Sequence, residues 1–262
     1  MIDVVVVTSK LSKNLYYLSP GDLELKIGDS IVFETENGLL IGIVCKEKYQ
    51  EKSNNLVLPL NKIIRIASPD DLKKEKKNED ISNKALTDAK KISNSLELDM
   101  SFVDAYYYLD NSQLVFSFLS ENRVDFRELA KKLAAKYKTR IELRQVGVRD
   151  KAKKIGGLGP CGLFLCCNSF LTDFNSVSIN MAKNQMLALN PSKINGICGR
   201  LLCCLGYEND TYTELKKDLP KIGLVADTSM GMGKVVSVDI FKKTYSVDLK
   251  EKGIVTFSKD EK

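Results

Sequence analysis

"SFVDAYYYLD" (101–110), "SQLVFSFLS" (112–120), "DFRELAKKLAAKY" (125–137) and "TRIELRQVGV" (139–148) follow one another in the middle of the chain. The first two segments flank a short Asp-Asn-Ser turn and are typical of paired strands. The third places Phe126, Leu129 and Leu133 on one face of a helix. The order strand, strand, helix, strand predicts a small sheet with its helix on one side, and hence an α+β protein.

Two local details follow from the same stretch. Asp125 is expected to cap the helix, with Glu128 completing a capping box. In the last strand, the alternation of apolar residues shifts between Leu143 and Val146, which predicts a β-bulge.

On the N-terminal side, residues 1–66 are typical of strands and turns. The segment "IGDSIVFETENGLLIGIV" (27–44) alternates apolar residues around Asn-Gly, which predicts a hairpin in a small β-barrel-like module. Ser68 and Pro69 then form a helix start. Apolar residues recur at helical spacing up to Leu96, so we expect a long, largely exposed helix between two modules.

On the C-terminal side, "IGLVADTSMGMGKVVSVD" (222–239) has the same outline as segment 27–44, which predicts a second β-barrel-like module. The sequence therefore predicts five parts. They are an N-terminal β module (1–66), a connecting helix (67–99), an α/β unit (100–154), a cysteine-rich segment (155–220) and a C-terminal β module (221–262).

The cysteine-rich segment repeats one pattern of thiols. "IGGLGPCGLFLCCN" (155–168) and "GICGRLLCCL" (196–205) both contain Cys, four residues, then two adjacent cysteines. One helix is expected between them, from Ser176 or Ser178 to just before Pro191. Six of the seven cysteines lie in the two copies, and Cys45 lies alone in a strand.

A cluster of thiolates is unfavourable without a cation, because like charges repel. Thiolate ligands suit Zn²⁺ or an iron–sulfur cluster, and a four-residue gap can place both ends against one ion. In an extended segment, adjacent cysteines point to opposite sides, so each pair is expected to give one inner ligand. Buried small side chains and a disulfide redox switch are the alternatives.

The composition excludes several classes of protein. The chain has no histidine, which excludes a Ser-His-Asp triad, a Cys-His dyad and mixed Cys/His zinc sites. Without a histidine to activate a thiol, we expect no enzyme. No apolar run approaches the roughly 20 residues of a membrane span. The odd number of cysteines argues against a disulfide framework, so we expect a cytoplasmic protein with reduced thiols.

Positive charge is concentrated in one part of the chain. Residues 121–154 hold twelve basic and five acidic residues, a net charge of +7, whereas the whole chain carries +6. Such a segment can attract nucleic acid or an acidic partner, or it can be a solvated helix face. Together with Tyr106, Tyr107 and Tyr108, it raises the alternative of a zinc-stabilised module that binds RNA.

Several longer motifs of the chain are similar to those of a known protein family. "RVDFRELAKKLAAKYKTRIELRQVGVRDKAKKIGGLGPCG" (123–162), "VSINMAKNQ" (177–185) and "LNPSKINGICGRLLCC" (189–204) resemble the polymerase-suppressor (PSP) C-terminal domain family. The similarity runs from the N-terminal module to about residue 250 and is densest over 123–208. One departure is that Leu163 and Phe164 replace the Arg-Pro of the family's first cysteine loop, while the second loop keeps Gly199 and Arg200.

The resemblance implies a non-catalytic cytoplasmic regulator that binds an iron–sulfur cluster. We expect a cluster of the 4Fe-4S type, with zinc as the alternative. It implies a complex with two small helical partners, RicA- and RicF-like proteins, which assists RNase Y in mRNA processing and acts in sporulation, biofilm formation and competence. By position, the candidate ligands are first Cys161, Cys166 and Cys198, and then the adjacent Cys167, Cys203 and Cys204. Candidate contacts to nucleic acid or a partner are Arg123, Arg127, Lys131, Arg140, Arg144, Arg149, Lys153, Lys154 and Arg200.

Overall fold

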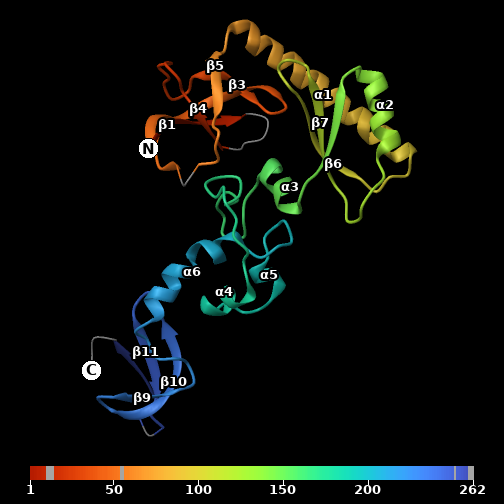
Figure 1. Ribbon diagram of the computed structural model, residues 1–262. Coiled ribbons are helices and arrows are strands. Elements are labelled where there is room, and N and C mark those ends of the chain that lie inside the picture. The colour runs from red at the N-terminus through yellow and green to blue at the C-terminus, as the bar shows by residue number, and fades with distance from the viewer. Residues whose placement is uncertain (10–14, 54–55, 251, 259–262) are drawn as a thin grey trace. The chain divides into compact units, whose positions relative to one another are not determined.

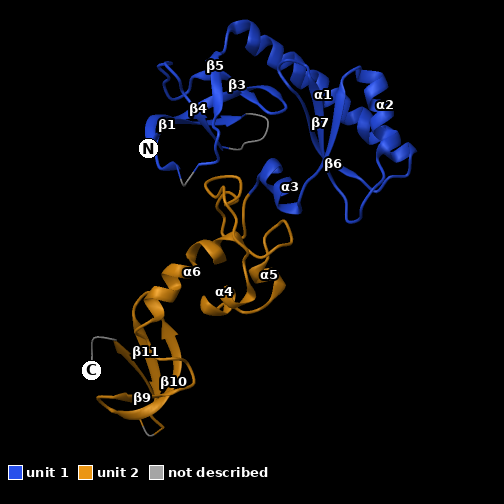
Figure 2. Ribbon diagram, in the orientation of Figure 1, with its two compact units in different colours: residues 1–157 blue, residues 158–262 orange. Residues whose placement is uncertain are grey.

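The computed structural model describes residues 1–9, 15–53, 56–250 and 252–258 (Figure 1). The chain forms two compact units, Met1–Gly157 and Leu158–Lys262 (Figure 2). The first unit contains a β-barrel, a long helix and an α/β sheet, and the second contains the cysteine segment and a β-sheet. The α+β class expected from the sequence is therefore confirmed. Within the described residues, no helix is both long and apolar enough to cross a membrane.

The N-terminal strands close into a barrel in the order β1-β2-β5-β3-β4. Their bounds are β1 Ile2–Ser9, β2 Leu15–Ser19, β3 Ser30–Thr35, β4 Gly38–Glu51 and β5 Asn61–Ile66. The barrel interior holds Val5, Leu18, Ile31 and Phe33, all fully buried. The expected hairpin is β3–β4, with Thr35 opposite Gly38. The N-terminal barrel-like module is thus confirmed.

Gly38 explains why the hairpin turn contains glycine. Its φ of +146° lies in a region that side chains rarely adopt. A Cβ atom there would lie 2.7 Å from the Ser112 hydroxyl and 3.0 Å from the Tyr108 ring. The hairpin tip therefore packs directly on the turn between the first two strands of the α/β sheet.

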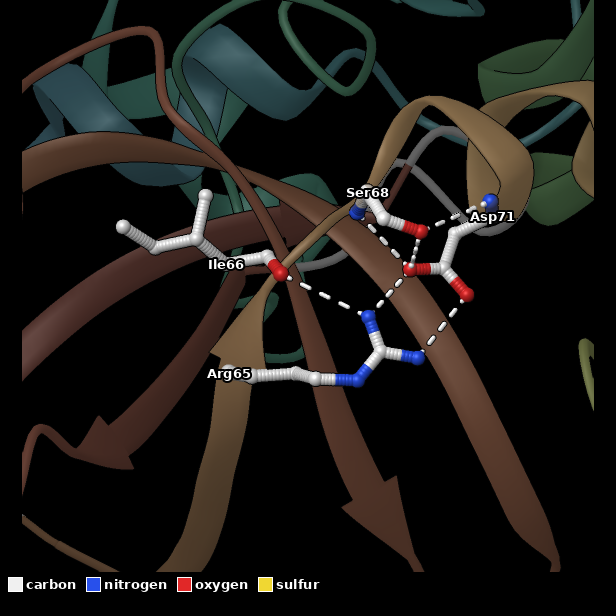
Figure 3. A network of polar contacts seen from close by, with 4 residues as sticks. All are labelled: Arg65, Ile66, Ser68 and Asp71. Atoms are coloured by element: carbon white, nitrogen blue, oxygen red, sulfur yellow. Dashed lines mark hydrogen bonds and ion pairs between the residues drawn. The ribbon is translucent and has the colours of Figure 1, made fainter.

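Helix α1 (Pro69–Ser95) is the connecting helix that the sequence predicts. The Ser68 hydroxyl accepts the Asp71 N–H, and the Asp71 carboxylate accepts the Ser68 N–H, so both halves of a capping box are present (Figure 3). The buried residues of α1 are all small, namely Asn78, Ser82, Ala85, Ala89 and Ser93. Small side chains at this spacing let the helix lie close to the sheet.

The α/β sheet has the order β6-β7-β8, with β6 (Ser101–Tyr107) antiparallel and β8 (Arg140–Gln145) parallel to the central β7 (Gln113–Leu119). Helix α2 (Arg127–Tyr137) connects β7 to β8. Leu129 and Leu133 of α2 join Phe116 and Phe118 of β7 in one buried cluster. The predicted order of strand, strand, helix and strand is confirmed.

Two local predictions for this sheet are wrong. Phe126, not Asp125, is the N-cap of α2, and no side chain caps the helix. Asp125 instead accepts the Arg127 N–H and pairs with the Arg127 guanidinium at 2.6 Å. The β7–β8 pairing has no register shift, and the irregularity lies between Phe102 and Asp104 of β6. The chain after β8 leaves the sheet and forms helix α3 (Val148–Ile155), which explains the change of alternation.

In the second unit, the expected helix from Ser178 towards Pro191 is shorter than predicted. Helix α4 spans only Ile179–Asn184, with Ser178 as its N-cap, because Met186 adopts a φ of +55°. Two further helices follow, α5 (Pro191–Ile194) and α6 (Cys203–Lys216). Helix α6 was not predicted, and it begins at the second pair of adjacent cysteines.

The C-terminal strands are β9 (Val225–Thr228), β10 (Gly231–Asp239), β11 (Thr244–Asp248) and β12 (Ile254–Ser258). All neighbouring pairs are antiparallel, in the order β12-β11-β10-β9. Val235, Val247 and Phe257 form a small buried cluster on one face. The C-terminal module is β, as expected, but its described strands form an open sheet and not a second closed barrel.

Candidate thiol cluster

The two cysteine loops, which we define as Leu158–Cys167 and Asn195–Cys204, share the same bridge and hydrogen bonds in their first seven residues. Each closes with an isolated antiparallel bridge, Leu158 to Phe164 in the first and Asn195 to Leu201 in the second. The Gly159 N–H donates to the Leu163 carbonyl, and the Gly196 N–H donates to the Arg200 carbonyl, both at 2.8 Å. The duplicated sequence pattern is therefore a duplicated structure.

Glycine is required at the same place in both loops. Gly162 and Gly199 directly follow the first cysteine of each loop and have φ values of +80° and +78°. The Gly162 N–H donates to the Gly159 carbonyl at 3.0 Å, and the Gly199 N–H donates to the Gly196 carbonyl at 2.9 Å. This left-handed conformation costs a residue with a Cβ atom about 1–2 kcal/mol, so glycine makes the tight turn accessible.

The first cysteine of each loop lies against the backbone of a preceding glycine. A Cβ atom on Gly159 would lie 3.4 Å from the Cys161 sulfur, and one on Gly196 would lie 3.9 Å from the Cys198 sulfur. Each sulfur therefore folds back over its own loop. Backbone N–H groups of such loops are the groups that tune a bound thiolate.

The adjacent cysteines are not in extended segments, so the geometric reason for expecting them to point to opposite sides does not apply. After Cys166 and Cys167 the chain turns, with the Asn168 N–H donating to the Leu165 carbonyl at 2.9 Å. Cys203 and Cys204 form the first turn of α6. Neighbouring side chains of a helical turn diverge by about 100°, not 180°, so both can face one side of the segment.

Sulfurs from both loops lie close enough to influence one another. Burial raises the pKa of the Cys166 thiol, and the Cys161 thiolate and the Glu208 carboxylate raise it further. Burial also raises the pKa of the Cys204 thiol, followed by the charges of Cys166, Glu208 and Cys161. Cys161 and Cys166 of the first loop, and Glu208 of α6, thus lie within electrostatic range of Cys204 of the second loop. We call these three cysteines the thiol cluster.

The remaining cysteines occupy different surroundings. Cys167 is buried, and Cys198 and Cys203 are partly exposed. Cys45 is exposed on β4 of the first unit and donates weakly to the Ile43 carbonyl. Among the described residues, no three Cys, Asp or Glu side chains already have the arrangement of a formed metal site.

Helix α6 holds one side of the thiol cluster. Cys204, Glu208 and Tyr212 recur every four residues along it, so they share one face. The Tyr207 ring packs edge-on against Phe170, which follows the first loop, with centroids 5.1 Å apart. The buried Gln185 amide donates to the Leu205 carbonyl at 2.7 Å. Glu208 was missed in the sequence, although its spacing of four from Cys204 would have indicated a shared face.

The structure separates the predicted basic contacts into paired and exposed residues. Arg127, Arg144 and Lys154 form ion pairs with Asp125, Glu142 and Asp104. Arg123, Lys131, Arg140 and Arg200 are exposed, while Arg149 and Lys153 are partly buried. Arg200 lies in the second cysteine loop, and the others lie in the first unit. The net charge of +7 already counts Asp125 and Glu142, so of these three pairs only Lys154 with Asp104 neutralises part of it.

The tyrosines of β6 are engaged in packing. Tyr106 and Tyr108 lie edge-on to each other with centroids 5.6 Å apart and pack on the barrel interior. Tyr107 packs on the opposite side, in the cluster between the sheet and its helices. Rings held in this way are not exposed for stacking on RNA bases, which weakens that part of the RNA-binding alternative.

Comparisons with known proteins agree with the resemblance carried by the motifs. Residues 61–146 match the PSP1 C-terminal conserved region, and residues 176–219 match the third domain of PSP1-like proteins. The chain is 45% identical over 251 residues to the Stage 0 sporulation protein YaaT of Bacillus subtilis (strain 168). That alignment covers 95% of this chain and 90% of the relative. No solved structure matches the chain.

Proposed function

Because the chain belongs to the PSP1 family, we propose that it is a non-catalytic regulatory subunit that binds an iron–sulfur cluster and assists RNase Y in mRNA processing. Its relative YaaT is by name a stage 0 sporulation protein, and we propose a related regulatory role for this chain. We place this role in the cytoplasm, where thiols stay reduced.

The observation that supports the proposal is that two cysteine loops built on the same hydrogen-bonded turn hold Cys161, Cys166 and Cys204 within electrostatic range of one another. Partly buried thiolates repel one another, and burial disfavours their charged form. A bound cation would reverse both effects. Three soft thiolate donors fit an iron–sulfur cluster or Zn²⁺, whereas they do not fit Mg²⁺ or Ca²⁺.

We propose that Cys161, Cys166 and Cys204 hold the group, with Cys167, Cys198 and Cys203 as the other candidate ligands. When bound, a 4Fe-4S cluster would supply a one-electron redox centre and a fixed crosslink between the two loops. The chain's own contribution is to present the sulfurs on loops shaped by Gly162 and Gly199. RicA- and RicF-like proteins are the proposed partners of this assembly.

The decisive experiment is anaerobic purification followed by iron, zinc and acid-labile sulfide analysis. We expect iron with matching sulfide in the natural protein and its loss in Cys161→Ser and Cys204→Ser. Cys45→Ser is the matched control, because Cys45 is an exposed thiol outside the loops, and it should keep full content. Full iron and sulfide in both loop variants would overturn the assignment.

Zinc without sulfide would instead favour the alternative of a zinc-stabilised module that binds RNA. The exposed Arg123, Lys131 and Arg140 support that alternative. Its test is the salt dependence of binding to a single-stranded RNA. Affinity that falls steeply between 50 mM and 200 mM salt would support phosphate contacts, and no binding at 50 mM salt would exclude them.

A further inference from the structure

A second site lies at the opposite end of α6 from the thiol cluster. It is a cavity of about 560 Å³ within the second unit, formed by α4, the end of α6, the segment after α6, and β10. This volume falls in the range of about 300–1,000 Å³ that small-molecule sites occupy. The cysteines take no part in its lining.

Among the described residues, four lysines line this cavity and no carboxylate does. They are Lys183 from α4, Lys216 from the last turn of α6, and Lys217 and Lys221 from the segment after it. We call this cavity the lysine pocket. Four lysine residues at one cavity create a local positive field that favours an anion.

Lys216 is the most constrained of the four. Its ammonium group donates to the Asn184 carbonyl, and burial lowers the pKa of its ammonium group. A partly buried ammonium group that donates to a neutral carbonyl is stabilised further when an anion lies nearby. The nearby carboxylate of Asp239 is not a partner for the Lys216 ammonium group. Asp239 lines a different hollow and pairs with Lys242 at 3.8 Å.

Helix dipoles explain the positions of only some of the four lysines. Lys183 and Lys216 lie in the last turns of α4 and α6, where cations are favourable. Lys221 lies outside any helix, yet it lines the same cavity. The helix ends therefore do not account for all of the charge that gathers here.

Apolar residues also line the lysine pocket, and we call them its apolar wall. Met186, Leu219, Ile222 and Val238 line it together with Pro220. Met186 reaches its place through a left-handed φ of +55°, which ends α4 and turns the chain. An apolar wall in a cavity that lysines also line suits a ligand that has both an organic part and a charged part.

We propose that the lysine pocket binds a small phosphate ester. The lysines hold the phosphate, and the apolar wall receives the organic part. A hollow of this size encloses a small molecule, whereas an extended RNA backbone would need a groove that continues along the surface. The proposal uses none of the cysteines, so its test is independent of the iron–sulfur assignment.

The test is calorimetric titration of the full chain with adenosine 5′-monophosphate, inorganic phosphate and adenosine. We expect saturable one-to-one binding of the monophosphate that weakens about tenfold or more in Lys216→Gln and Lys221→Gln. Lys234→Gln is the matched control, because Lys234 is exposed on β10 but does not line the pocket, and it should bind normally. Thermal unfolding of each variant establishes that it is folded.

The ligands also distinguish the parts of the proposal. Inorganic phosphate binding as tightly as the monophosphate would assign recognition to the phosphate alone and remove the role of the apolar wall. Adenosine binding as tightly as the monophosphate would overturn the role of the lysines. No binding of any ligand at 10 mM, or equal weakening by all three variants, would overturn the site.

Discussion

Gly162 and Gly199 show how a single residue type shapes the candidate site. Both have φ near +80°, and an added Cβ atom would meet nothing within 4 Å at either position. Their need for glycine therefore comes from the backbone conformation and not from crowding. Each glycine directly follows the first cysteine of its loop. Its conformation therefore sets the direction of the backbone after that cysteine.

We expect Gly162→Ala to destabilise the first cysteine loop by about 1–2 kcal/mol and to lower the sulfide content of the anaerobically purified protein. Gly162→Asn should recover part of the loss, because asparagine adopts positive φ more readily than alanine. Sulfide analysis and urea unfolding measure the two effects. Equal losses in the two variants would show that backbone conformation is not the cause.

At the scale of elements, the junction between β5 and α1 is fixed by one carboxylate. The Asp71 carboxylate accepts hydrogen bonds from the Ser68 N–H and hydroxyl, both at 2.8 Å, and pairs with the Arg65 guanidinium (Figure 3). The Arg65 guanidinium, with help from Ser68, holds the pKa of Asp71 far below its usual range. The side chain of Asp71 is only 12% exposed, so solvent screens these contacts weakly. One residue thus caps the helix and ties it to the barrel.

Asp71→Asn should lower the free energy of unfolding by about 1–2 kcal/mol at pH 7. Because the folded pKa of Asp71 lies below its unfolded value of about 3.9, its charged form stabilises the protein above that pH. This stabilisation is lost as the pH falls further, so the difference between natural protein and variant should narrow below about pH 4.

Urea titrations at pH 7 and at pH 3 measure this change. Asp70→Asn is the matched control, because the Asp70 side chain is 89% exposed and pairs only with Lys73 in the next turn. It should change stability little at either pH. A constant difference between the natural protein and Asp71→Asn across both pH values would contradict the role of the charged carboxylate.

At the scale of the whole molecule, the chain contains two units with separate hydrophobic cores. Leu129 is fully buried in the cluster of the α/β sheet, and Val247 is fully buried in the C-terminal sheet. The thiol cluster and the lysine pocket both belong to the second unit. Units that have their own cores can unfold in separate steps, and a two-state description of the whole chain then fails.

We expect Leu129→Ala to destabilise the first unit by about 2–5 kcal/mol, and Val247→Ala to destabilise the second unit by a smaller amount. Hydrogen exchange followed by mass spectrometry resolves the two units in the intact chain. Each substitution should reduce protection mainly in its own unit. Equal loss of protection in both units from either substitution would show that the chain unfolds as one cooperative block.

Much of the local structure was predictable from sequence. The 3.6-residue spacing that ends in Leu96 predicted α1, and the patterns of residues 101–148 predicted β6, β7, α2 and β8. Local details were less predictable where one polar group had two possible partners. Asp125 accepts hydrogen bonds from both the N–H and the guanidinium of Arg127, while Phe126 occupies the N-cap position of α2.

By itself, the sequence determined the type of α1, β6, β7, α2 and β8 and the duplication of the cysteine pattern, because periodicity and spacing act over a few neighbouring residues. Only the tertiary structure decided that Cys204 lies within electrostatic range of Cys161, Cys166 and Glu208. It also decided that Lys183 and Lys221 line one cavity. These groupings depend on the path of the chain through α4 and α5, and a path of that kind is set by packing between distant residues and not by local spacing.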